Sequence, residues 1–120
     1  MILVDTSIWV DHLRKGDSGL VSLLEEGQVS CHPYLIGELA CGSLKNRREI
    51  LTLLRALPAT VVASDNEVHE VIDQHRLYGI GIGLIDVHLL TSSLLSGEPL
   101  WTRDKALASA AKKLKASYSS

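Results

Sequence analysis

Short apolar runs alternate with longer segments of helical periodicity along this chain of 120 residues, and this alternation most constrains its fold. The runs at residues 2–4, 29–32, 60–63 and 99–102 predict buried strands. Between them, apolar residues recur at helical spacing. Gly, Pro, Ser and Thr mark where these segments begin and end. Alternating strands and helices favour an α/β sandwich around a parallel sheet.

One domain accommodates the whole chain at this length. We expect it to span residues 1–120, with about four to five mostly parallel strands flanked by helices, and to fray from about residue 116. Apolar residues form 46% of the chain and charged residues 22%, which is typical of a globular protein and argues against long disordered stretches.

Targeting signals are not evident. No apolar run approaches the roughly 18 residues of a membrane span. The start, 1–5, lacks the basic region of a signal peptide, so we expect a cytoplasmic protein. Cys31 and Cys41 match no zinc or redox motif, so they are expected to be buried free thiols.

The net charge of −2 does not by itself indicate nucleic-acid binding. The basic residues are nevertheless gathered into the three clusters 14–15, 45–48 and 112–115. A cluster of this kind is usually a solvated face. Arranged around an acidic cleft, the three together would be able to hold a phosphate backbone.

Four acidic residues stand where a globular chain should avoid them. Asp5 follows the first apolar run, Glu38 and Asp86 have apolar neighbours, and Asp104 follows the last strand. Burying an unpaired carboxylate costs several kcal/mol, so each acid needs a partner. Local roles remain open: Asp5, Asp86 and Asp104 can cap helices, and Glu38 can pair with an arginine.

Convergence of the four acids is the alternative to these local roles. Asp5 and Asp104 follow strands at the edge where parallel sheets bind ligands. If the helices of Glu38 and Asp86 begin at the same edge, the four like charges need a countercharge, for which Arg103 is the nearest basic residue. A divalent cation meets that need, and oxygen-only ligands favour Mg²⁺ or Mn²⁺ over zinc. Such a centre activates water for attack on a phosphoryl group.

At these residues the chain resembles the PIN-domain family, and within it the VapC-type toxins of bacterial toxin–antitoxin pairs. The opening motif 4–9 (VDTSIW), the acid Glu38, the motif 84–87 (LIDV) and the motif 102–104 (TRD) carry the resemblance. It extends over nearly the whole chain, and its first and last motifs together are the most specific.

The resemblance implies a Rossmann-like PIN fold and an endoribonuclease that depends on Mg²⁺ or Mn²⁺. It also implies a homodimer and a VapB-type antitoxin that blocks the site. The catalytic and metal-binding residues carried over are Asp5, Glu38, Asp86 and Asp104. Thr6 and Thr102 match hydroxyl positions that support these ligands.

One departure from the family pattern is His88, where relatives often have a small residue. Because it lies two helical positions from Asp86, we expect its side chain to point away from the metal and to serve packing or an interface.

Two other functions remain open. A haloacid-dehalogenase-like phosphotransferase also begins with an aspartate after a strand, but Ser7 stands where its second acid belongs. A PIN-like module that only binds RNA or protein would need no metal.

Overall fold

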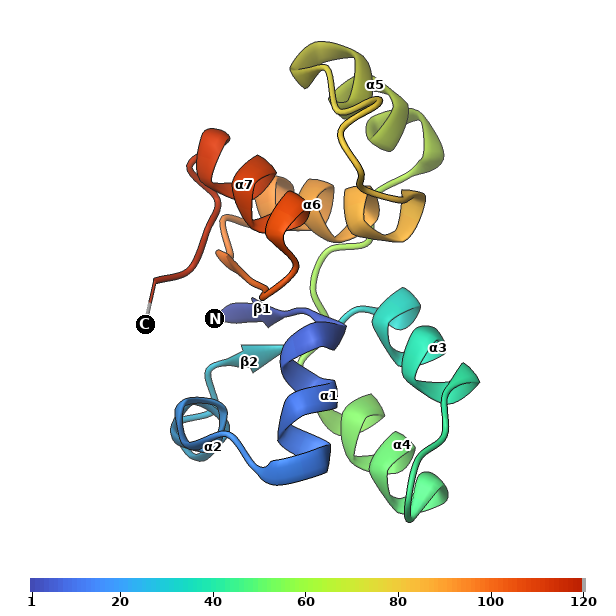
Figure 1. Cartoon of the computed structure of the whole chain (residues 1–120), viewed down its shortest axis with the longest axis vertical. Helices are drawn as coiled ribbons and strands as arrows, with labels where there is room; N and C mark the ends of the chain where they lie inside the picture. Colours follow the sequence, from blue (N-terminus) through green and yellow to red (C-terminus); the bar gives the residue numbers. More distant parts are fainter. Residues whose placement is uncertain (120) are drawn as a thin grey trace.

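The computed structural model describes residues 1–119, which form a three-stranded parallel sheet between two groups of helices (Figure 1). The central strand β1 (Ile2–Val4) lies between β2 (Val29–Ser30) and β3 (Leu100–Trp101), with Leu3 paired to both Ser30 and Leu100. The helices are α1 (Thr6–Lys15), α2 (Ser18–Glu25), α3 (Pro33–Cys41), α4 (Arg47–Ala56), α5 (Asp65–His75), α6 (Leu84–Ser96) and α7 (Lys105–Lys113). In Figure 1, α5 to α7 lie above the strands and α1 to α4 below them.

The core lies around β1 and α6. Leu3 and Val4 are fully buried, although β1 has only three residues. Helix α6 is buried without interruption from Val87 to Ser93, so it runs through the interior and not over the surface. The buried run combines apolar residues with the polar His88, Thr91, Ser92 and Ser93.

Local sequence signals set several helix boundaries as predicted. Ser64 and Glu67 form a reciprocal capping box at the start of α5. Pro33 occupies the first turn of α3. Gly97 adopts the left-handed conformation that ends α6, with φ at 73°. The predicted α/β architecture is confirmed.

The expected strand at 60–63 is wrong, and the sheet has three strands where four to five were expected. Only a single bridge, between Cys31 and Ala59, extends the sheet there. Val61 and Val62 are each 50% exposed, and only the ends of this segment, Thr60 and Ala63, are buried. Because the two central valines are not packed into the core, this run lacks the side-chain packing that stabilises a strand.

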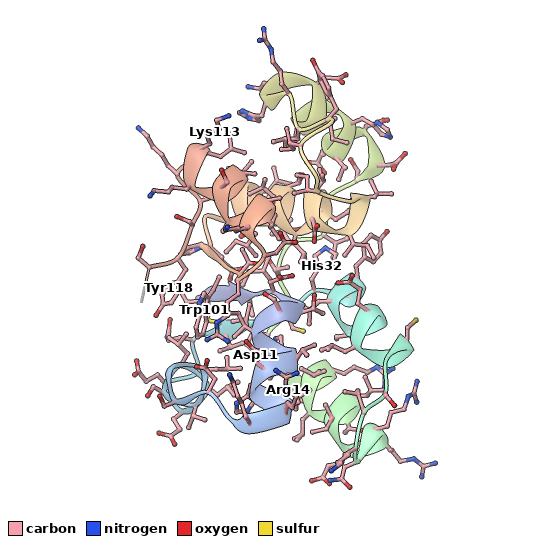
Figure 2. The ribbon with its side chains drawn as sticks, viewed as in Figure 1. Asp11, Arg14, His32, Trp101, Lys113 and Tyr118 are labelled. Atoms are coloured by element: carbon pink, nitrogen blue, oxygen red, sulfur yellow. The ribbon has the colours of Figure 1, made fainter. Side chains whose placement is uncertain are left out.

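The C-terminal segment does not fray from residue 116 as expected. Ala116 is buried, and the backbone of Leu100 in β3 bonds to both Ala116 and Tyr118. The ring of Tyr118 lies 5.5 Å from that of Trp101 (Figure 2). These backbone bonds and this aromatic contact hold the segment along the sheet; Ser120 lies outside the described residues.

Two buried histidines join α3 to α6. His32 caps α3 by accepting a hydrogen bond from Tyr34 N, and its ring lies between the two helices (Figure 2). Burial and the neighbouring His88 lower the pKa of His32 to about 4, so its imidazole is neutral near pH 7. His88 packs 4.7 Å from the Tyr34 ring, consistent with a packing role.

The two cysteines differ in environment. Both are free thiols, as expected. Cys31 is buried, but Cys41 is exposed at the end of α3, so the expectation of two buried thiols holds for only one of them. Across residues 1–119, no helix combines the length and apolar character that crossing a membrane requires.

Adjacent serines of α6 provide a test of this packing. The buried Ser92 hydroxyl has no hydrogen-bond partner among the described residues, whereas Ser93 Oγ donates to the carbonyl of Glu98. Because an unpaired buried hydroxyl is costly, Ser92→Ala should raise the free energy of unfolding by about 1 kcal/mol. Ser93→Ala, the matched control, should lower it by about 1 kcal/mol in denaturant titrations. Equal losses in the two variants would contradict this account of the α6 interior.

Candidate active site

Three helix N-termini meet at the carboxyl edge of the sheet, and each carries one of the predicted acids. Asp5 follows β1 and caps α1, accepting from Ser7 N at 3.4 Å. Asp104 caps α7, accepting from Ala106 N at 3.0 Å. Asp86, in the first turn of α6, accepts from Gly83 N at 3.3 Å. The positive ends of three helix dipoles therefore stabilise these carboxylates.

Asp5 is the buried centre of this arrangement, with 3% of its surface exposed. Its Oδ2 accepts hydrogen bonds from Thr102 Oγ1 at 2.7 Å and from Ser7 Oγ at 2.8 Å. Thr6 Oγ1 lies 3.2 Å from its Oδ1. Hydroxyls from α1 and from the segment after β3 thus satisfy a carboxylate that has no cationic partner among the described residues.

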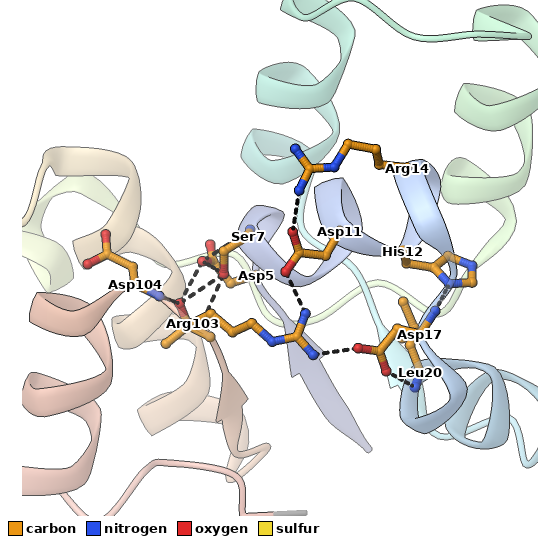
Figure 3. A network of polar contacts seen from close by, with 10 residues as sticks. Asp5, Ser7, Asp11, His12, Arg14, Asp17, Leu20, Arg103 and Asp104 are labelled. Carbon is orange, nitrogen blue, oxygen red and sulfur yellow. Dashed lines mark hydrogen bonds and ion pairs between the residues drawn. The ribbon is translucent and has the colours of Figure 1, made fainter.

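The same hydroxyls also fix the segment between β3 and α7. Arg103 N donates to Ser7 Oγ, and Asp104 N donates to Thr102 Oγ1, each at 3.0 Å. Each hydroxyl therefore donates its proton to Asp5 and accepts from the backbone (Figure 3). This double use positions Asp104 relative to Asp5.

Glu38 and Asp86 complete the acidic group. Thr6 Oγ1 lies 3.1 Å from Glu38 Oε1, so one hydroxyl serves both Glu38 and Asp5. Burial raises the pKa of Glu38, and the nearby Asp5 and Asp86 raise it further. Burial also raises the pKa of Asp86, with contributions from Asp5 and Asp104. The acids therefore interact as like charges.

All four acids line one open hollow of about 720 Å³. Among residues 1–119, none of them forms a salt bridge with lysine or arginine, so the arginine partner considered for Glu38 is not observed. The capping considered for Asp5 and Asp104 is observed, and it coexists with their position at the hollow.

The donor set suits a hard divalent cation. No three His, Cys, Asp or Glu side chains of residues 1–119 form a ready-made metal cage. The hollow nevertheless brings together carboxylate oxygens whose negative charge is not paired with a cation. Uncompensated carboxylates and oxygen-only donors are what Mg²⁺ and Mn²⁺ prefer.

The predicted basic clusters lie differently around this centre. Arg14 and Lys45 line a second hollow that shares Thr6, Val10 and Glu38 with the acidic one. By contrast, the third basic cluster lies on α7 and beyond it, and Lys113 lines a separate cavity beside α5. Two of the three clusters therefore contribute residues next to the acids.

Three residues of the hollow were not singled out from the sequence as part of the site: Ser7, Asp11 and Val10. Ser7 lies two residues from Asp5 in the first motif, so its place in the site could have been predicted from the sequence. Asp11 pairs with Arg103, 92 residues away, at 2.7 Å. That pairing is tertiary and leaves no local pattern.

The burial of Asp86 and its acidic neighbours predict a pH-dependent stability. Because the pKa of Asp86 is raised on folding, the folded protein binds more protons than the unfolded chain between the two values. The stability of the metal-free protein should therefore fall as pH rises through that window. Asp86→Asn keeps an oxygen for Gly83 N and removes the charge. It should raise the melting temperature at about pH 7, and the gain should disappear below the ordinary pKa of 3.8.

Thermal unfolding in chelator, followed across pH, checks this expectation. Asp73→Asn, at an exposed position of α5, is the matched control and should show no such pH-dependent gain. A gain for Asp86→Asn that persists unchanged in acid would show that the charge on Asp86 is not its cause.

Comparisons with known proteins agree with this architecture. A model of the PIN domain matches residues 2–113. Ribonuclease VapC32 of Mycobacterium tuberculosis, from strains CDC 1551 / Oshkosh and ATCC 25618 / H37Rv, is 48% identical over 111 residues, which cover 92% of this chain and 90% of the relative.

A solved structure shares the fold. A chain in the structure of FitAB bound to IR36 DNA fragment superposes with a TM-score of 0.63 at 18% identity, covering 93% of this chain and 91% of that one. At this identity the likeness concerns the fold alone. The family model and the identity to VapC32 extend over almost the whole length, so the chain belongs to the PIN-domain family.

Proposed function

We propose that this protein is a metal-dependent endoribonuclease and the toxin of a type II toxin–antitoxin pair. The observation that carries the proposal is the open hollow lined by four carboxylates that pair with no lysine or arginine among the described residues. Its occurrence in a PIN-domain protein 48% identical to one named Ribonuclease VapC32 supports RNA as the substrate.

In this proposal, Asp5, Glu38, Asp86 and Asp104 hold Mg²⁺ or Mn²⁺, and residues 1–120 act as a single domain. When bound, the cation supplies Lewis-acid chemistry, offsetting the charge of the scissile phosphate and lowering the pKa of the attacking water. Thr6 and Thr102 orient the carboxylates they touch. Asp104 is a ligand or positions the water, and Glu38 completes the acidic pocket.

The proposal extends to partners. A toxin of this kind acts with a VapB-type antitoxin, and the relatives' name VapC supports that class of partner for this chain. We also infer a homodimer that acts in the cytoplasm, where RNA is available. Arg14 and Lys45, beside the acidic hollow, are suited to contact the phosphate backbone.

Neutralising an acid without disturbing the fold is the direct test. Asp86→Asn and Glu38→Gln preserve shape. Within residues 1–119 each of these side chains accepts a single hydrogen bond, so both variants should fold. Each should cut RNA at least about 100-fold more slowly than the parent in Mg²⁺. Asp73→Asn should cleave normally, and equal cleavage by the parent and Asp86→Asn would rule out this site. Asp5→Asn is a poorer choice, because Asp5 also holds α1 and the β3–α7 segment together.

Further measurements distinguish a ribonuclease from the two other functions considered for this chain. PIN membership removes the basis for the haloacid-dehalogenase alternative, and no phosphorylated Asp5 should be trapped. A module that only binds would show no uptake of Mg²⁺ or Mn²⁺ by calorimetry and no cleavage. Sequencing RNA ends after brief induction, with Asp86→Asn as control, should identify cuts that depend on the acid.

A further inference from the structure

Arg103 lines the acidic hollow, but its guanidinium pairs with Asp11 and Asp17 and with none of the four acids. Nη1 donates to Asp11 Oδ2 at 2.7 Å, and Nη2 pairs with Asp17 Oδ2. Its guanidinium lies 5.7 Å from the centre of the Trp101 ring. Figure 3 shows the side chain leaving the region of Asp5 and Ser7 and reaching toward Asp11 and Asp17. Among the residues that line this hollow, Arg103 is the only lysine or arginine.

Both partner carboxylates have contacts of their own. Asp17 caps α2 by accepting from Leu20 N at 3.0 Å, and its backbone N donates to His12 Nδ1 at 3.1 Å. Asp11 lies on α1 and also pairs loosely with Arg14, at 3.7 Å. Arg103 in turn lowers the pKa of Asp17. The guanidinium of Arg103 is therefore bound both by α1, through Asp11, and by the N-cap of α2, through Asp17.

Bonds other than those of the guanidinium hold the segment that carries Asp104. The backbone of that segment is already bound to Ser7 and Thr102, and β3 pairs with β1. The ion pairs therefore have another consequence. A free guanidinium beside Asp104 would be drawn to the uncompensated acids, because its planar fork matches carboxylate geometry.

We propose that Asp11 and Asp17 are positioning residues that hold the Arg103 guanidinium away from Asp5, Glu38, Asp86 and Asp104 and so keep these four carboxylates open to a divalent cation. Without them, Arg103 becomes an internal competitor that neutralises the acids itself. This inference rests on the proposed function, because it assumes that the hollow binds a cation.

Calorimetric titration of Mn²⁺ tests the inference without measuring cleavage. The double variant Asp11→Asn/Asp17→Asn should bind Mn²⁺ about tenfold more weakly than the parent. Adding Arg103→Met should restore the parent affinity, because the competitor is gone. The matched control adds Arg14→Met to the double variant. It removes the same charge from the other partner of Asp11 and should not restore the affinity for Mn²⁺. Arg103→Met alone should bind at least as tightly as the parent.

Several results would overturn the inference. The first is binding of Mn²⁺ by the double variant as tight as by the parent. The second is equal rescue by Arg14→Met and Arg103→Met, which would indicate a general effect of charge. The third is weaker binding by Arg103→Met alone, which would indicate that Arg103 supports the position of Asp104. Circular dichroism checks that each variant folds. If the double variant does not fold, Asp11→Asn alone keeps the Asp17 cap of α2 and carries the same comparisons. Absence of Mn²⁺ uptake by the parent would overturn the proposed function as well. If the parent binds Mn²⁺ and Asp86→Asn does not, the proposed site stands, and the Asp11, Asp17 and Arg103 variants then test this inference alone.

Discussion

The buried carboxylate of Asp5 is the interaction on which the rest of the site depends. It follows the central strand, caps α1 and accepts hydroxyls from both α1 and the segment after β3. A buried charge without a cation costs several kcal/mol, and these hydrogen bonds are what offset that cost. Because Ser7 and Thr102 also accept from the backbone of 103–104, satisfying Asp5 places Asp104 at the same edge.

The same geometry accounts for the positions of the neighbouring acids. Parallel pairing of β1 and β3 aligns their carboxyl ends, and the helix N-termini of α1, α6 and α7 meet there. Burial, and after it repulsion from neighbouring acids, raises the pKa values of Glu38 and Asp86. The helix dipoles partly offset the charge of Asp5, Asp86 and Asp104. The remaining negative charge is a cost of folding in the metal-free protein that a bound cation would offset. Arg103, which lines the same hollow, is held by Asp11 and Asp17 instead.

Local patterns predicted much of the fold and the positions of two acids. Asp5 and Asp104 were predictable because each lies between a strand and the helix that follows it. The capping box of Ser64 was also predictable from local sequence. The strand at 60–63 was wrong because burial of Val61 and Val62 depends on what covers them, which composition does not reveal. The partners of Arg103 lie 92 and 86 residues away, so no local signal identifies them. Capping and site membership, treated as alternatives for Asp5 and Asp104, coexist in the fold.

The central claim is that these four carboxylates act together by binding one kind of cation at the edge of the sheet. Anomalous diffraction from crystals grown with Mn²⁺ tests that claim most directly. We expect a manganese peak in the hollow, within bonding distance of oxygens from Asp5 and Asp86 and adjoining Glu38 and Asp104. Full occupancy of Mn²⁺ elsewhere, with the acids unliganded, would contradict the account.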